Sequence, residues 1–64
     1  MMTLKQKFQW LAIQMQGDKL SLGGFGDSIL GSYLIADSGN QHRLELAFKD
    51  LIEDEFKMWY KRID

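Results

Sequence analysis

The pattern of apolar and polar positions is most distinctive in the last third of the chain. From residue 40 to residue 62, apolar residues recur at three- and four-residue spacing, which predicts one long amphipathic helix. They cover well over half of its circumference, whereas packing on one side of a small core needs a stripe little more than about 100° wide. The set comprises Leu44, Ala47, Phe48, Leu51, Ile52, Phe56, Met58, Trp59 and Tyr60. This surplus predicts a second contact, with a copy of the chain or with another protein.

The first third predicts another helix, from Thr3 to about Gln16. The Thr3 hydroxyl can cap its first turn, and Gly17 suits the turn after its end. Helical spacing places one apolar set on one face, namely Leu4, Phe8, Leu11 and Met15. Trp10 and Ile13 fall on the opposite face. Apolar residues on two faces favour a helix that lies between its own core and a partner.

The middle third is open to two interpretations. Glycines at 23, 24 and 26 predict a loop, followed by a short helix to Ala36 with Asp27 or Ser28 as its N-cap. The fold is then mainly α, with two longer helices flanking a glycine-rich loop and a short helix in a single domain, 1–64. The alternative is an α+β fold, in which 32–36 and 42–48 form a central β-hairpin between two helices. The scarcity of β-branched residues favours helix for 29–47.

Composition narrows the classes of function. A 64-residue domain buries only about 60% of its unfolded surface and often depends on oligomerisation for stability. The chain has no Cys and only one His, His42, which argues against a zinc site, and we expect no cofactor. A net charge of −1 argues against a nucleic-acid partner. The two-faced first helix argues against a membrane surface, and the lack of a signal-peptide pattern predicts a cytoplasmic protein.

Two short motifs share Ser28. The stretch from Phe25 to Leu30, FGDSIL, resembles the first block of GDSL-type hydrolases, whose Ser is the nucleophile. That chemistry needs a base and an orienting acid, and His42 follows without the family's Asp-x-x-His pattern. Gly26-Asp27-Ser28 is also similar to the motif of carrier proteins, which implies phosphopantetheine on Ser28. The family's acidic helix is missing here, because 29–36 contains no charged residue.

The sequence therefore predicts a small protein-binding module rather than an enzyme. It acts through self-association, as a homodimer, or through another protein, with an exposed aromatic helix face as the contact. The alternative is a carrier-like module modified at Ser28, or a small regulator associated with a membrane surface or nucleic acid. Glu55 falls inside the apolar arc of the long helix, where a buried carboxylate would need a partner. Either it lies at the edge of an interface and meets a Lys or Arg of another chain, or the helix bends or ends earlier and Glu55 is solvated. The predicted contact residues are Trp10, Ile13, Glu55, Phe56, Trp59 and Tyr60.

Overall fold

Four α-helices make up the fold in the computed structural model, which describes residues 1–63. They are α1 (Leu4–Gln16), α2 (Gly23–Ile35), α3 (Ser38–Ala47) and α4 (Lys49–Ile63). The mainly α prediction is confirmed. The β-hairpin alternative is wrong, since the described residues contain no strand, and the three-helix count is wrong because the predicted long helix is two helices.

Helix α1 forms as its sequence predicts. The Gln6 N–H donates to the Thr3 hydroxyl at 3.1 Å, and the Thr3 N–H donates to the Gln6 side-chain oxygen at 2.8 Å. This reciprocal pair satisfies two backbone donors that no helical carbonyl can reach. The inward face then buries Phe8 and Leu11 completely.

Helix α2 begins earlier than predicted, because the glycine cluster forms its first turn rather than a loop. Asp27 is not the N-cap residue. Its carboxylate instead reaches back and accepts from the Leu22 N–H at 2.7 Å and from the Ser21 hydroxyl at 2.6 Å. Gly26 is buried in this turn, and a Cβ placed on it would lie 2.3 Å from the Leu22 Cβ. The polar anchor and this close approach outweigh the weak helix propensity of the glycines.

The predicted long helix is interrupted at Phe48. Asp37, three residues before the predicted start of the helix, accepts from the Asn40 N–H at 2.8 Å and starts α3. Phe48 leaves helical geometry with φ −118° and ψ 25°, although its N–H still bonds to the Leu44 carbonyl. No Gly or Pro marks this position. The half-buried Phe48 ring packs against the core. The interruption of the helix thus coincides with a tertiary contact and not with a helix-breaking residue.

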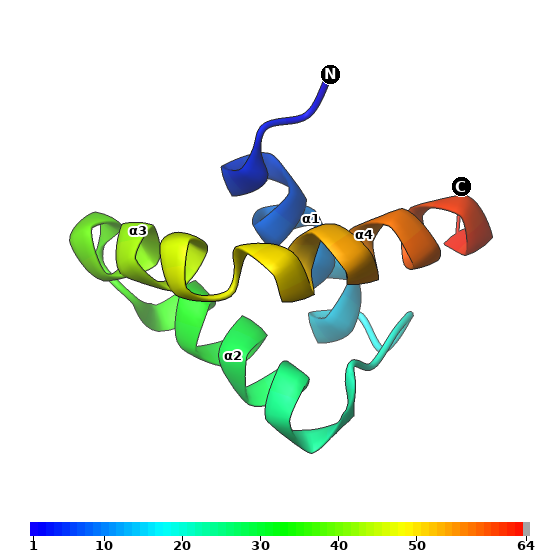
Figure 1. Cartoon of the computed structure of the whole chain (residues 1–64). Helices are drawn as coiled ribbons and strands as arrows, with labels where there is room; N and C mark the ends of the chain where they lie inside the picture. The colour runs from blue at the N-terminus through cyan, green and yellow to red at the C-terminus, as the bar shows by residue number, and fades with distance from the viewer. Residues whose placement is uncertain (64) are drawn as a thin grey trace.

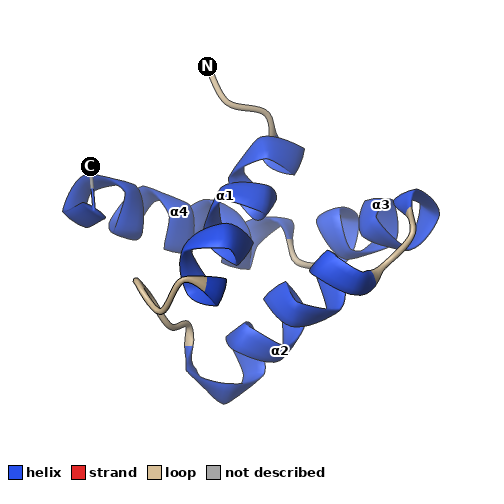
Figure 2. Cartoon of the chain, turned by 180° about the vertical axis from the view of Figure 1, so that it is seen from behind, coloured by secondary structure: helices blue, strands red, loops and turns tan. Residues whose placement is uncertain are grey.

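The helices enclose one hydrophobic core around α1. Helix α4 crosses α1, and α2 and α3 form the other side of the molecule (Figures 1 and 2). The backbones of α2 and α4 stay more than 8 Å apart, so α1 and α3 link them. The buried core consists of Phe8, Leu11, Ala12, Leu20, Ile29, Leu30, Tyr33 and Ile52. No helix among the described residues has the length and apolarity required to cross a membrane.

A buried polar pair lies inside this core. Tyr33 stacks on Phe8 with ring centroids 4.0 Å apart, and its hydroxyl donates to a Glu45 carboxylate oxygen at 2.6 Å. Burial, and then the hydrogen bond to Glu45, raise the pKa of the Tyr33 hydroxyl above its usual range. Glu45 turns inward, and the break at Phe48 separates it from Lys49 of α4, with which it makes no ion pair.

Candidate interaction surface

An aromatic cluster joins α1 to α4. The Trp10 ring meets Phe56 and Tyr60 edge-on, with centroid distances of 5.4 and 5.3 Å. Phe56 and Tyr60 stack on each other at 4.8 Å. Edge-to-face and offset-stacked rings at these distances attract one another beyond their burial of area. The fold therefore brings three of the predicted contact residues together. Part of their surface is buried by contacts within the chain.

The cluster remains partly open to solvent. Trp10 and Phe56 are half-buried, and Tyr60 keeps 38% of its surface exposed. Ile13, one helical turn after Trp10 on α1, is 59% exposed. We call the surface formed by Trp10, Ile13, Phe56 and Tyr60 the aromatic face. It is the largest grouping of predicted contact residues that the fold assembles.

The other two predicted contact residues, Glu55 and Trp59, lie on the adjacent flank of α4. The Trp59 indole N–H donates to the Glu55 carboxylate at 3.2 Å, and the Arg62 guanidinium lies 5.4 Å from the Trp59 ring. The partner that Glu55 requires is thus a residue of its own helix. Among the described residues, the Trp59 ring makes no ring–ring pair with Trp10, Phe56 or Tyr60.

An ion pair borders the aromatic face. The Lys7 ammonium lies 2.6 Å from a Glu53 carboxylate oxygen and 5.6 Å from the centre of the Phe56 ring. Both side chains are only partly exposed. Glu53 therefore pairs across two helices and makes no ion pair with Lys57, which lies four residues later on α4. This long-range pair fixes the edge of α1 against α4.

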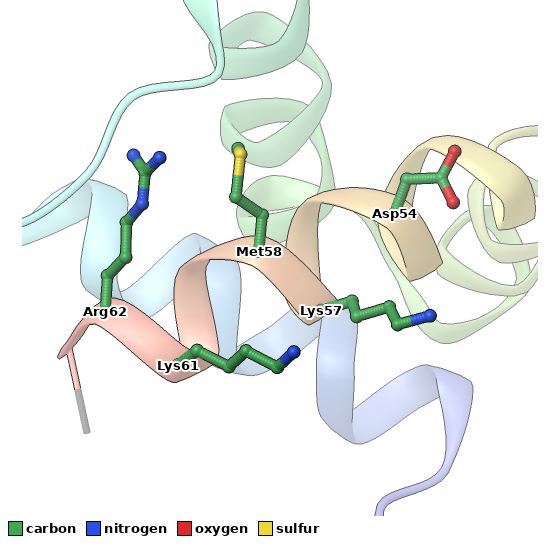
Figure 3. Close-up of a pocket in the computed structure, with 5 residues that line it drawn as sticks. All are labelled: Asp54, Lys57, Met58, Lys61 and Arg62. Atoms are coloured by element: carbon green, nitrogen blue, oxygen red, sulfur yellow. The ribbon is translucent and has the colours of Figure 1, made fainter.

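The outer side of α4 carries a second surface, which the sequence analysis did not identify. A shallow depression there is lined by Asp54, Lys57, Met58, Lys61 and Arg62, all projecting from one helix (Figure 3). We call it the basic face. Its signal in the sequence is the spacing of Lys57 and Lys61 with Met58 between them. The sequence does not reveal this surface, because the four-residue spacing predicts an ion pair between Glu53 and Lys57 that would neutralise the lysine.

Other exposed apolar side chains were also missed. Phe25, at the start of α2, is 69% exposed and meets the half-buried Phe48 edge-on at 6.0 Å. The prediction of a glycine loop gave no orientation for Phe25. Ile35 on α2 and Leu46 on α3 are also exposed.

The chemistry-bearing residues show no catalytic arrangement around Ser28. Its hydroxyl donates to the Phe25 carbonyl at 2.7 Å, within α2 rather than at its first turn. His42 lies on α3, 3.7 Å from a Glu45 oxygen. Residues 1–63 contain no group of three His, Cys, Asp or Glu side chains that could hold a metal ion. No protein family, curated protein or solved structure compared with this chain matches it.

Proposed function

We propose that the chain is a small non-enzymatic protein-binding module that self-associates through its aromatic face. The observation that carries the proposal is the partly open cluster of Trp10, Phe56 and Tyr60, with the exposed Ile13 one helical turn after Trp10 on α1. Large aromatic side chains at the centre of an interface contribute most of its binding energy. A two-fold dimer is the commonest symmetric assembly and would place this face against itself.

The geometry favours binding over covalent chemistry on this face. Its side chains are apolar or aromatic, and the neighbouring charged groups, Lys7 and Glu53, neutralise each other. Tyr60 can bury its ring and keep its hydroxyl in water, a property that suits an interface rim. Glu55 and Trp59 lie on the adjacent flank of α4, and we place them at the border of the interface.

Light scattering on a sizing column, across a range of protein concentrations, tests self-association. We expect a dimer mass that falls to the monomer mass on dilution. Ile13→Asp introduces a charge into the exposed part of the aromatic face and should abolish the dimer. Ile35→Asp is the matched control. Ile35 is the last residue of α2 and is 88% exposed, so this substitution should leave the mass unchanged.

Two outcomes would count against this function. A folded wild-type chain that stays monomeric at every concentration excludes self-association. A phosphopantetheine adduct on Ser28, seen by intact-mass spectrometry of protein from its native host, would favour the carrier-like alternative instead.

A further inference from the structure

The basic face of α4 has an excess of positive charge that residues 1–63 do not neutralise through ion pairs. Lys57 and Lys61 lie four residues apart on one helix, where like charges repel. Glu53, which lies four residues before Lys57, is held by Lys7 of α1 at 2.6 Å. Among the described residues, neither Lys57 nor Lys61 makes an ion pair. Only Asp54 carries negative charge among the side chains that line this depression.

An apolar side chain lies beside Lys57 and Lys61, on the neighbouring strip of the α4 surface (Figure 3). Met58 is 40% exposed and projects from the same side of α4 as Arg62 and Asp54 (Figure 3). Methionine is unbranched and adaptable, and it is common on surfaces that accept varied apolar partners. The Arg62 guanidinium lies over the Trp59 ring, which limits its freedom and keeps it beside the depression.

We propose that the basic face of α4 binds an acidic peptide segment. The segment would carry two carboxylates one helical turn apart, with an apolar side chain between them. Lys57 and Lys61 are one helical turn, about 5.4 Å, apart along α4. Two glutamates at four-residue spacing on a helical peptide are the same distance apart, so each can face one lysine. The apolar side chain of the segment would then lie on Met58.

The same surface suits other anionic partners less well. A membrane-surface helix turns its apolar side toward the lipid, whereas the apolar side of α4 packs inward on the core through Ile52 and Phe56. Nucleic acid is bound through many phosphate contacts. This face has only Lys57, Lys61 and Arg62, next to Asp54. Three cations around one apolar residue match a short acidic peptide more closely.

This inference deepens the proposed protein-binding function, on which it rests for its class of partner, but it uses a different surface. The aromatic face would hold a second copy of the chain, and the basic face would hold the acidic segment. The two faces adjoin, because Lys57 and Lys61 also line a depression with Phe56 and Tyr60. The two proposals can still fail separately, because the oligomeric mass and the peptide affinity are measured independently on each variant.

Nuclear magnetic resonance of the isotope-labelled full chain tests the proposal directly. The probe is a synthetic acetylated and amidated helical peptide, in which glutamates at four-residue spacing flank a central leucine. We expect chemical-shift changes concentrated at residues 54–62. Affinity should fall about tenfold when salt is raised from about 0.02 M to about 0.2 M, because salt screens exposed charges. The same peptide with glutamine in place of glutamate should bind at least about tenfold more weakly.

Two charge-matched double variants locate the site. Lys57→Glu/Lys61→Glu should weaken peptide binding by at least about tenfold. Lys19→Glu/Lys49→Glu makes the same change in net charge at exposed lysines outside the depression and should leave affinity within about twofold. Circular dichroism and light scattering on each variant establish that it is folded and has the wild-type mass.

Clear outcomes would overturn the proposal. Equal binding of the glutamate and glutamine peptides, or equal loss of affinity in both double variants, would contradict it. The absence of shift changes in 54–62 at peptide concentrations up to about 1 mM would also contradict it. Tighter binding of phosphatidylglycerol vesicles or of duplex DNA through Lys57 and Lys61 would assign the face to that partner instead.

Discussion

Substitution by alanine should have different effects on stability at two glycines of α2. Gly26 and Gly31 lie in the same helix, so alanine improves helix propensity by about 1 kcal/mol at either position. At Gly31, an added Cβ would meet no atom within 4 Å. At Gly26, it would lie 2.3 Å from the Leu22 Cβ. Only the second substitution therefore forces its surroundings to move.

The magnitude follows from what must move. The Leu22 Cβ is bonded directly to the backbone, so a rotamer change cannot relieve the overlap. Displacing Leu22 would strain its 2.7 Å hydrogen bond to Asp27, which anchors the start of α2. Overpacking of this kind costs about 1–3 kcal/mol. Gly31→Ala should thus raise the free energy of unfolding by up to about 1 kcal/mol, and Gly26→Ala should be less stable than Gly31→Ala by about 1–3 kcal/mol.

Urea unfolding followed by circular dichroism measures both variants beside the wild type. For a chain of this size, each kcal/mol moves the melting temperature by about 4–8 °C, so thermal unfolding gives an independent reading. Equal stabilisation by the two alanines would refute the reasoning, because it would mean that Leu22 and Gly26 do not approach closely. Equal destabilisation would refute the assignment of Gly31 to open space.

Three further predictions concern the core and its polar contacts. Tyr33→Phe should lower the free energy of unfolding at neutral pH by about 1–3 kcal/mol, because it leaves a buried carboxylate without its donor. Above pH about 10, the unfolded chain loses the Tyr33 proton while the folded chain keeps it. The free energy of unfolding of the wild type should therefore fall by up to about 1.4 kcal/mol per pH unit in that range. Urea titrations across alkaline pH should show that the difference in the free energy of unfolding between wild type and Tyr33→Phe becomes smaller. The same pH dependence in both proteins would contradict this. Tyr60→Phe, at an exposed ring, is the control. Ile52→Ala, at a fully buried position, should cost about 2–5 kcal/mol in the same denaturation assay, whereas Ile35→Ala should change stability by less than about 0.5 kcal/mol. Glu53→Gln should cost no more than about 1 kcal/mol, and an effect that persists in high salt would contradict an ion pair that is partly open to solvent.

Local sequence was sufficient to predict α1. Thr3, Gln6 and Gly17 mark its ends within a few residues, and its apolar periodicity correctly separated the buried Phe8 from the exposed Ile13. Capping bonds and helical periodicity act over at most a few residues, so they can be identified without knowledge of the rest of the fold.

The boundaries of α2 and α4 required longer-range information. Glycine propensity indicated a loop at 23–26, but Asp27 anchors this segment as a helical turn. The region around Phe48 has no helix breaker, so the sequence indicated one continuous helix. The bend accompanies packing of the Phe48 ring against the core and beside Phe25, two helices apart. Such contacts override local propensity and leave no short-range signal.

The candidate contact residues divide in the same way. The sequence by itself determined that Trp10 and Ile13 share one side of α1 and that α4 has more aromatic residues than packing on one side of a core requires. Only the tertiary structure decided that Trp10 meets Phe56 and Tyr60, which leaves a smaller exposed face than periodicity alone would suggest.

The charges show this most clearly. Spacing along the sequence offers Glu53 to Lys57, but the crossing of α1 over α4 brings Lys7 within 2.6 Å of Glu53 and leaves Lys57 on the basic face beside Lys61. The order of residues along one helix determines which charges share its surface. Which of those charges are already neutralised depends on another helix, and sequence spacing carries no record of that distance.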